Sequence, residues 1–164
     1  MQLKSRAFEN GGTIPDRFSC EGDDVSPPLS WTGVPPAAEA LALICEDPDA
    51  PLKTFTHWVL YDLPAHASGL PEGISKNPVV IGEAKQGTNS YGRLGYDGPC
   101  PPTGPFHRYF FKLYALDRPL HLKNGAHKKE LENAMEGHVL AEAQMVGRYR
   151  KVKLGPLVHA LRGH

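Results

Sequence analysis

The chain has 164 residues and a mass of 17.9 kDa, a length that favours one domain over two. Lysine and arginine together number 18, as do aspartate and glutamate, so no net basic field attracts nucleic acid or an anionic membrane at long range. We therefore expect a globular protein that neither binds nucleic acid nor inserts into a membrane.

The N-terminal sequence has no apolar stretch of signal-peptide length, and the longest apolar run, residues 40–45, is far below the roughly 20 residues that span a bilayer. We expect a cytoplasmic protein. Its three cysteines, Cys20, Cys45 and Cys100, are too widely spaced for a zinc ribbon or a C-x-x-C motif, and their number is odd. The sequence therefore predicts no disulfide framework.

Five short segments predict strands, because they are rich in apolar, β-branched or aromatic residues and are separated by Gly, Pro, Asn and Asp. In chain order they are residues 3–8, 40–46, 54–61, 79–83 and 109–116. The second is almost entirely apolar, which predicts a buried central strand. In the third, alternation places His57 on the same face as Val59 and Tyr61.

One helix is predicted near the C-terminus, where Asn124 can cap a run of helical apolar spacing that Gly137 ends. A second short helix is predicted over residues 138–143, followed by a strand over 145–151. These patterns predict a mainly β fold with a few peripheral helices near the C-terminus, formed by a single domain over residues 1–150.

Residues 151–164 are interpreted as a basic C-terminal tail, because the chain from Gly147 onwards holds five basic residues and no acidic one. One alternative is a solvated tail. The other is an arm for self-association or partner docking, which leaves a homodimer open. The second alternative rests on four residues spaced to form one apolar helical face, Leu154, Leu157, Val158 and Leu161.

Three segments carry residues suited to chemistry: DPDAP at 47–51, THWV at 56–59 and the loop 98–109. The third holds four prolines before Phe106, which make it a stiff wall, and two glycines whose N–H groups a small anion can approach. Asp47 and Asp49 either form paired carboxylates or bond their own backbone in a turn. His57 and His107 are either site residues or structural histidines.

Two hydrolase alternatives follow from the same residues. Two histidines and a carboxylate can hold a catalytic metal, for which Asp47, Asp49, His57 and His107 are acceptable ligands. Cys100 on the loop can act as a nucleophile with His107 as its base. No short metal-binding or catalytic motif accompanies these residues.

Taken together, the segments resemble the phosphatidylethanolamine-binding proteins, in particular their bacterial branch, the Raf-kinase-inhibitor-like proteins. The resemblance covers nearly the whole chain. In order, it rests on IP at 14–15, FSCEG at 18–22, SPPLSW at 26–31, DPDAP at 47–51, THWVLYDLP at 56–64, GPCPP at 98–102, HRY at 107–109, EGHVLAEA at 136–143 and MVGRY at 145–149.

The resemblance implies a β-sandwich of antiparallel or mixed sheets with a small surface cavity that accepts anions such as phosphate head groups. The cavity would use Asp47, His57, His107 and Tyr109, with Asp49, Pro51, Gly98 and Pro101 shaping its wall. The resemblance also suggests a cis peptide bond before Pro51. It implies no catalytic residue, no metal and no cofactor.

We therefore expect a non-enzymatic module that captures a small phosphorylated or carboxylate ligand and modulates a protein partner such as a kinase or protease. An aspartate beside a bound anion would repel it, unless the carboxylate interacts with a histidine. A carboxylate that accepts one ring N–H orients the imidazole and leaves its other nitrogen aimed at the ligand. Asp47 would take this role, or would accept the ammonium group of a zwitterionic ligand.

Overall fold

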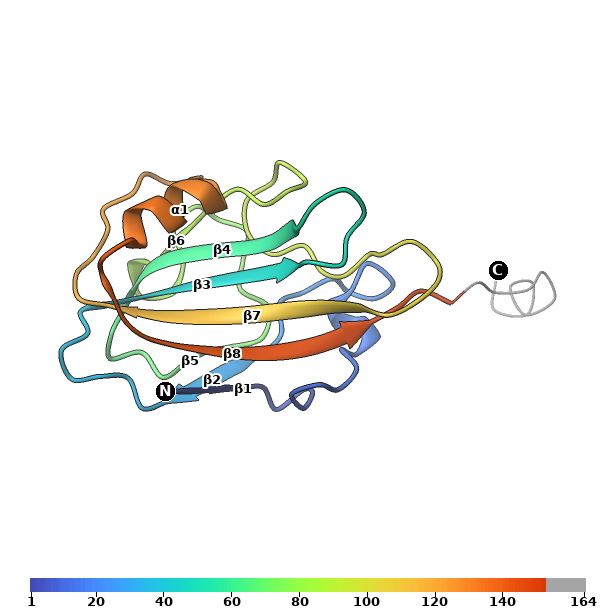
Figure 1. Cartoon of the computed structure of the whole chain (residues 1–164), viewed down its shortest axis with the longest axis horizontal. Coiled ribbons are helices and arrows are strands. Elements are labelled where there is room, and N and C mark those ends of the chain that lie inside the picture. Colours follow the sequence, from blue (N-terminus) through green and yellow to red (C-terminus); the bar gives the residue numbers. More distant parts are fainter. Residues whose placement is uncertain (153–164) are drawn as a thin grey trace.

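Short β-branched and aromatic segments dominate this sequence, and strands accordingly dominate the computed structural model, which describes residues 1–152 (Figure 1). The strands are β1 (Gln2–Lys4), β2 (Leu29–Thr32), β3 (Ala40–Asp47), β4 (Phe55–Pro64), β5 (Gly69–Leu70), β6 (Lys85–Gln86), β7 (His107–Leu116) and β8 (Val139–Tyr149). The helix α1 (Lys128–Met135) precedes β8, and two 3₁₀ turns are η1 (Asp16–Phe18) and η2 (Ile81–Glu83). The predicted mainly β fold is confirmed.

Two antiparallel sheets form the frame. The larger has the strand order β6-β4-β3-β7-β8, and the smaller has the order β1-β2-β5. β3 lies at the centre of the large sheet and is buried along its whole length, as its apolar sequence predicts. Figure 1 shows the small sheet beneath β8 and the helix α1 over one end of the large sheet.

Alternating side chains place apolar groups on both faces of the large sheet, and each face has its own core. The core between the sheets includes Leu3, Trp31, Leu43, Trp58, Phe111 and Met145. The core beneath α1 includes Ile44, Val59, Tyr61, Leu131 and Met135. Burying each large apolar side chain stabilises the fold by about 1.5–3 kcal/mol, so these two layers fix where the ends of β3, β4 and β7 lie.

Several predicted elements are wrong. Residues 79–83 do not form a strand, because Gly82 and Glu83 both adopt positive φ angles and the chain turns at η2. Residues 138–143 belong mainly to β8 instead of a helix, since β8 pairs with β7 from Val139 onwards. The predicted strand over residues 3–8 shrinks to β1.

The helix begins later than predicted. Asn124 does not cap it, because Gly125 follows with a φ of 79° and breaks the helical path. His127 is the N-cap instead, and its backbone N–H donates to the side chain of Glu130 at 3.1 Å. Gly137 follows the helix at a φ of 81°, as its position in the sequence predicts.

Residues 1–152 contain no cis peptide bond, so the expected cis bond before Pro51 is wrong. Within the same residues no helix has the length and apolar character needed to cross a membrane. The proposed apolar face of the C-terminal tail, which includes Leu154 and Leu161, lies outside the described residues.

Candidate functional site

A cavity of about 250 Å³ opens at one end of the large sheet. The connection between β3 and β4, the start of β7 and the end of β8 all lie at this end (Figure 1). Six of the eight predicted site residues line the cavity, namely Asp47, Pro51, His57, Pro101, His107 and Tyr109. Three strands and two loops therefore bring together residues that are up to 62 positions apart in the sequence, counted from Asp47 to Tyr109.

Asp47 and His107 form a buried pair at the cavity. The Nδ1 atom of His107 lies 2.6 Å from Oδ2 of Asp47, and the two residues are 8% and 3% exposed. The other carboxylate oxygen of Asp47 accepts the backbone N–H of Asp49 at 2.7 Å. Asp47 thus combines the two roles that the sequence left open, because it caps its own turn and also orients a histidine ring.

His57 reaches the cavity through an irregularity in β4. Opposite β3, Cys45 faces Trp58 while Glu46 faces Thr56, so His57 is an extra residue of the kind found in a β-bulge. Its ring packs on Tyr109, with centroids 5.2 Å apart, on the side of the sheet opposite to Val59 and Tyr61. The predicted face of His57 is therefore wrong, because strict alternation cannot foresee a bulge.

The ring of His57 is held in place by a contact with the backbone. Its Nδ1 atom lies 2.7 Å from the main-chain carbonyl oxygen of Asp97. Burial lowers the pKa of His57, and this effect exceeds the opposing effects of the Asp97 hydrogen bond and of nearby carboxylates. Burial, followed by the charge of Asp47, raises the pKa of Tyr109 well above its ordinary value, so its phenol stays protonated.

Two aromatic residues that the sequence did not indicate complete the wall. Phe55 packs on His57 with ring centroids 5.0 Å apart, and Tyr91 meets Phe55 edge-on at 4.7 Å. Phe55 precedes His57 by two residues on the same strand, so its proximity could have been inferred. Tyr91 comes from a loop between β6 and β7 whose path no pattern in the sequence predicts.

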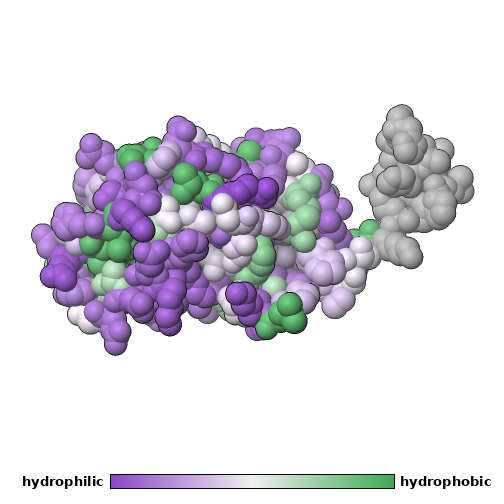
Figure 2. Space-filling view, turned by 90° about the horizontal axis from the view of Figure 1, so that it is seen from above, coloured by the Kyte–Doolittle hydropathy of each residue, from purple (hydrophilic) through white to green (hydrophobic). Residues whose placement is uncertain are grey.

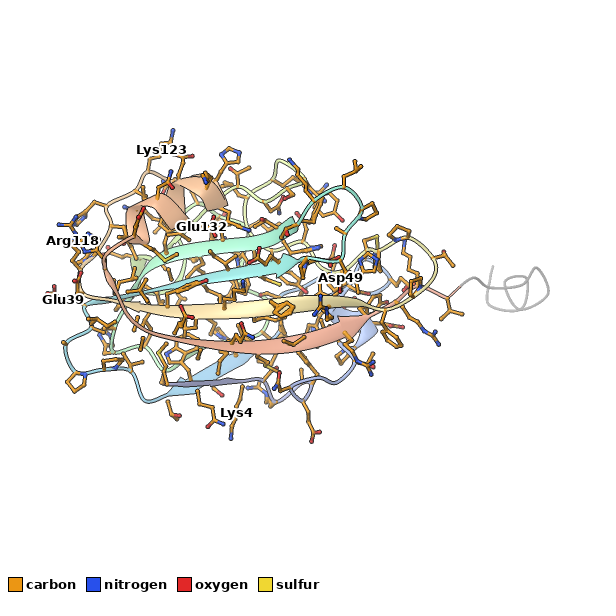
Figure 3. All side chains as sticks on the ribbon, viewed as in Figure 1. Lys4, Glu39, Asp49, Arg118, Lys123 and Glu132 are labelled. Atoms are coloured by element: carbon orange, nitrogen blue, oxygen red, sulfur yellow. A yellow bond between two sulfur atoms is a disulfide. The ribbon has the colours of Figure 1, made fainter. Side chains whose placement is uncertain are left out.

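Asp49 lies outside the cavity lining. Its carboxylate binds Arg108 in a fork, with Nε 2.9 Å from Oδ2 and a terminal nitrogen 2.8 Å from Oδ1. This hydrogen bonding lowers the pKa of Asp49. Figure 3 shows Asp49 beside the start of β7. The paired carboxylates therefore diverge, since Asp47 faces a histidine in the cavity and Asp49 faces an arginine at the surface.

Gly98 also lies outside the lining, and its N–H group is not free for a ligand. It donates to Oδ1 of Asp24 at 2.7 Å. A Cβ atom at this position would lie 2.0 Å from the carbonyl oxygen of Phe18, so the glycine is required by close packing of two backbone segments. The N–H of Gly104 is likewise used, by the carbonyl oxygen of Lys151 at 3.2 Å.

The expectation of no disulfide is wrong. Cys20 and Cys100 are bonded to each other across 80 positions, while Cys45 is a buried free thiol. The spacing concealed the pair because the fold, and not the local sequence, brings η1 beside the proline-rich loop. Cys100 lines the cavity, but as half of a disulfide it carries no thiolate to act as a nucleophile.

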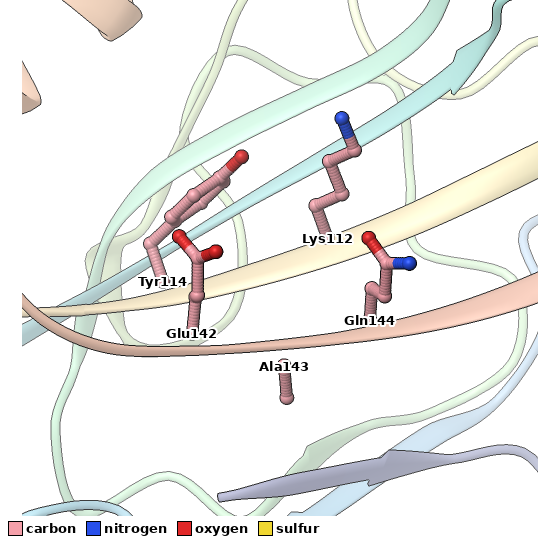
Figure 4. Close-up of a pocket in the computed structure, with 5 residues that line it drawn as sticks. All are labelled: Lys112, Tyr114, Glu142, Ala143 and Gln144. Carbon is pink, nitrogen blue, oxygen red and sulfur yellow. The ribbon is translucent and has the colours of Figure 1, made fainter.

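A second hollow, of about 180 Å³, lies on β7 and β8 and is lined by Lys112, Tyr114, Glu142, Ala143 and Gln144 (Figure 4). Lys112 at its edge lies 2.8 Å from the carboxylate of Glu46, so its charge is already matched. This hollow contains no histidine or cysteine. The residues suited to chemistry gather in the first cavity.

Comparisons with known proteins show which family the chain belongs to. The family model described as phosphatidylethanolamine-binding protein matches residues 4–150. A protein named UPF0098 from Methanothermobacter thermautotrophicus is 53% identical over 151 residues, covering 92% of this chain and 99% of its own length. The corresponding protein of Aquifex aeolicus is 48% identical over 153 residues, covering 92% and 89%.

Two solved structures share the fold. A phosphatidylethanolamine-binding protein (PEBP) homologue from Chlamydia trachomatis has a TM-score of 0.84 at 43% identity, covering 92% of this chain and 97% of its own. E. coli YbcL, described as a new member of the mammalian PEBP family, has a TM-score of 0.86 at 28% identity, covering 92% and 98%. The chain described here therefore belongs to the phosphatidylethanolamine-binding protein family.

Proposed function

We propose that this protein is a binding module whose cavity holds a small phosphate-bearing anion without chemical turnover. The observation that carries the proposal is the convergence of two histidine rings, from β4 and β7, whose Nδ1 atoms are both engaged by the protein. Within residues 1–152 both rings make their hydrogen bonds through Nδ1, and both residues line the cavity, so the Nε2 atoms are left for a ligand. Two oriented ring nitrogens in a small cavity suit a phosphate-bearing anion.

Asp47 supports an anion site instead of opposing one. Although Asp47 lines the cavity, its negative charge lies against Nδ1 of His107, so a protonated His107 ring compensates that charge and presents its Nε2–H to a ligand. The aromatic wall of Phe55, Tyr91 and Tyr109 makes the surroundings less polar, which strengthens the electrostatic attraction. A phosphate ester with a small organic group fits a cavity of about 250 Å³.

Titration calorimetry with methyl phosphate tests the proposal. We expect saturable binding to the parent protein at pH 5.5 and at least a tenfold weaker association with His107→Gln. The matched control is His138→Gln, because His138 makes the same type of contact with Asp117 at 2.9 Å but lies outside the cavity lining. Equal affinity of both variants would remove the cavity from the binding mechanism.

The metal-hydrolase alternative has a weaker basis. It needs three converging ligands, and no cluster of three His, Cys, Asp or Glu side chains suited to a metal occurs within residues 1–152. Asp49, one of the four candidate ligands, binds Arg108 instead. Non-enzymatic binding remains our prediction. Metal analysis of protein purified without added metal, followed by assays of ester hydrolysis with and without chelator, checks it.

Modulation of a protein partner is a second proposal, and the rim of the cavity supports it. Leu52 is completely exposed in the β3–β4 connection next to Pro51, and Phe106 is exposed at the start of β7. Figure 2 shows that hydrophobic residues are otherwise scattered as small spots on one mostly hydrophilic face. Leu52→Ser should keep the affinity for methyl phosphate but weaken inhibition of a responsive kinase or protease.

A cytoplasmic location remains a prediction, and the disulfide weighs against it. Reducing compartments keep most protein thiols reduced, although cytosolic proteins of hyperthermophiles are an exception. Rapid alkylation of thiols in intact cells, followed by mass spectrometry, decides the question. Alkylated Cys20 and Cys100 are expected in a reducing cytoplasm, and an intact bond would indicate an oxidising compartment.

A further inference from the structure

The protonation pattern of the His57 ring is set by its neighbours. A main-chain carbonyl can only accept a hydrogen bond, so the Nδ1 atom that lies 2.7 Å from the Asp97 carbonyl must carry the hydrogen. Asp97 cannot easily turn away, because its carboxylate is bound by Lys76 at 2.7 Å, Asn89 at 2.7 Å and Arg93 at 3.0 Å. The tautomer of His57 is therefore fixed.

Burial also favours the neutral form of the same ring. Burial lowers its pKa, while the hydrogen bond and charge of Asp97 and the charges of Asp47 and Asp24 act in the opposite direction without reversing the shift. The titratable groups that surround or face the ring are Asp24, Asp47, Tyr91, Asp97, His107 and Tyr109. A neutral ring with its hydrogen on Nδ1 has a lone pair on Nε2, so His57 presents an acceptor to the ligand.

His107 differs from His57 in the group that holds it. Its Nδ1 lies 2.6 Å from a carboxylate, which can stabilise the doubly protonated ring, whereas His57 faces a neutral carbonyl. In its protonated form His107 presents an Nε2–H donor to the cavity. With His57 neutral and His107 protonated, two histidines that look equivalent in the sequence offer opposite hydrogen-bonding groups, one acceptor and one donor.

We infer that the cavity selects a phosphate monoester that carries one proton, with its P–OH donating to Nε2 of His57 and a P–O⁻ oxygen accepting from Nε2 of His107. This inference rests on the proposed function and names its substrate class. A phosphodiester, which includes the phosphate of an intact phospholipid head group, has no P–OH. A sulfate ester has none either. Each would place an acceptor oxygen against the His57 lone pair and leave that nitrogen without a donor.

Three probes of equal charge separate these classes. At pH 5.5 methyl phosphate is mostly a monoanion with one P–OH, because the second pKa of a phosphomonoester is about 6. Methyl sulfate and dimethyl phosphate are monoanions without a hydroxyl. By titration calorimetry we expect methyl phosphate to bind at least tenfold more tightly than either. At pH 8 the phosphomonoester has lost its proton, and its advantage should fall below about threefold.

His57→Gln tests the residue directly. A glutamine amide can rotate to offer either an acceptor or a donor, so the variant should bind methyl sulfate and methyl phosphate within about threefold of each other at pH 5.5. His138→Gln, outside the cavity, should keep the parent's discrimination. If His57→Gln fails to fold, the comparison of the three probes in the parent protein still tests the selectivity for a protonated phosphate monoester.

The outcomes separate this inference from the proposed function. Tight binding of methyl phosphate with weak binding of the other two supports both. Equal binding of all three anions at the cavity would overturn the selectivity for a proton while leaving an anion-binding function intact. Binding of none of them would overturn the proposed function and this inference together.

Discussion

Asp47 decides at the scale of single residues whether the cavity attracts or repels an anion. As a bare charge it would repel phosphate, but its Oδ2 lies 2.6 Å from His107 and its Oδ1 accepts the N–H of Asp49. Both of its carboxylate oxygens are therefore engaged by donors of the protein. The residue acts through His107, which it positions, and does not need to touch the ligand.

Repulsion of the anion and positioning of His107 predict opposite changes in anion affinity when Asp47 is replaced by asparagine. If Asp47 mainly repels the anion, Asp47→Asn strengthens binding. If it positions His107, the variant weakens binding, and hydrogen bonds to charged groups, worth about 1.5–3 kcal/mol, predict a loss of at least tenfold in methyl phosphate affinity. Asp117→Asn removes the carboxylate of the other aspartate–histidine pair and should leave affinity unchanged. Titration calorimetry of both variants with methyl phosphate distinguishes the two roles of Asp47.

The lowered pKa of His57 links stability to pH. The unfolded chain titrates this residue near its ordinary value of about 6.5, whereas the folded protein does so at a lower pH. The contribution of the neutral His57 ring to the free energy of unfolding is therefore present in full above about pH 6.5. It is lost as the pH falls toward the pKa of His57 in the folded state, because the unfolded state then binds more protons. The loss is at most about 1.4 kcal/mol for each pH unit in that window.

His57→Gln removes this source of acid sensitivity. Denaturant unfolding of the parent and the variant between pH 5 and 7.5 should show a shallower fall of the unfolding free energy in the variant, whatever its absolute stability. His66→Gln, which removes an exposed histidine, serves as the control and should follow the parent. Identical slopes for His57→Gln and the parent would show that His57 titrates alike in both states.

Most of the polar site residues could be predicted from the sequence, and the reasons for the exceptions are physical. The family resemblance named Asp47, His57 and His107, whereas their local patterns alone left a turn and structural histidines as alternatives. Asp49 and Gly98 were assigned to the wall, but an arginine and a second backbone segment engage them instead. Tyr91 was missed because its loop is placed by tertiary contacts with Phe55 and His57.

At the scale of elements, the Cys20–Cys100 bond connects the segment after η1 to the loop that forms one wall of the cavity. The backbone reinforces this link, because the N–H of Cys20 donates to the carbonyl oxygen of Pro99 at 3.0 Å. The disulfide closes a loop of 80 positions, for which the chain-entropy model predicts about 4–5 kcal/mol of stabilisation.

Reduction of this bond should lower the melting temperature of the parent by about 4–20 °C, since losses of about 2–5 kcal/mol are typical and each kcal/mol shifts a domain of this size by about 2–4 °C. Thermal unfolding with and without reductant measures the effect. Cys100→Ser should melt like the reduced parent and should not respond to reductant. An unchanged melting temperature in parent protein whose two thiols are shown to be free would contradict the account.

The strands with strong apolar sequences, β3, β4 and β7, were predicted within a few residues, whereas the short strands were not. β2, β5 and β6 hold only two to four residues each, too few for a period to be recognised. β8 was divided into a helix and a strand because Val139 and Leu140 are adjacent apolar residues, both exposed, and the alternation begins only at Ala141. Pairing with β7 overrides that weak local preference.

At the scale of the whole molecule, two sheets and a helix form the frame that places the cavity at one end. The chain has equal numbers of acidic and basic residues, so no net charge attracts an anion at long range. Attraction must therefore be local, from oriented ring nitrogens and backbone-fixed partners. The family resemblance in the sequence gave the fold class correctly, because motifs spread from residue 14 to residue 149 recur in order. It could not give the tautomer of a histidine, which depends on one carbonyl 40 positions away.

Nitrogen-15 NMR of the histidine rings, titrated with methyl phosphate at pH 5.5, tests the central claim most directly, with His57→Gln and His107→Gln used to assign the signals. We predict that in the free protein near pH 7 the His57 ring carries its hydrogen on Nδ1 and a lone pair on Nε2. We further predict that methyl phosphate shifts the Nε2 signals of His57 and His107 and leaves His138 unchanged. A His57 ring protonated on Nε2 in the free protein, or titration that shifts neither cavity histidine, would contradict the account.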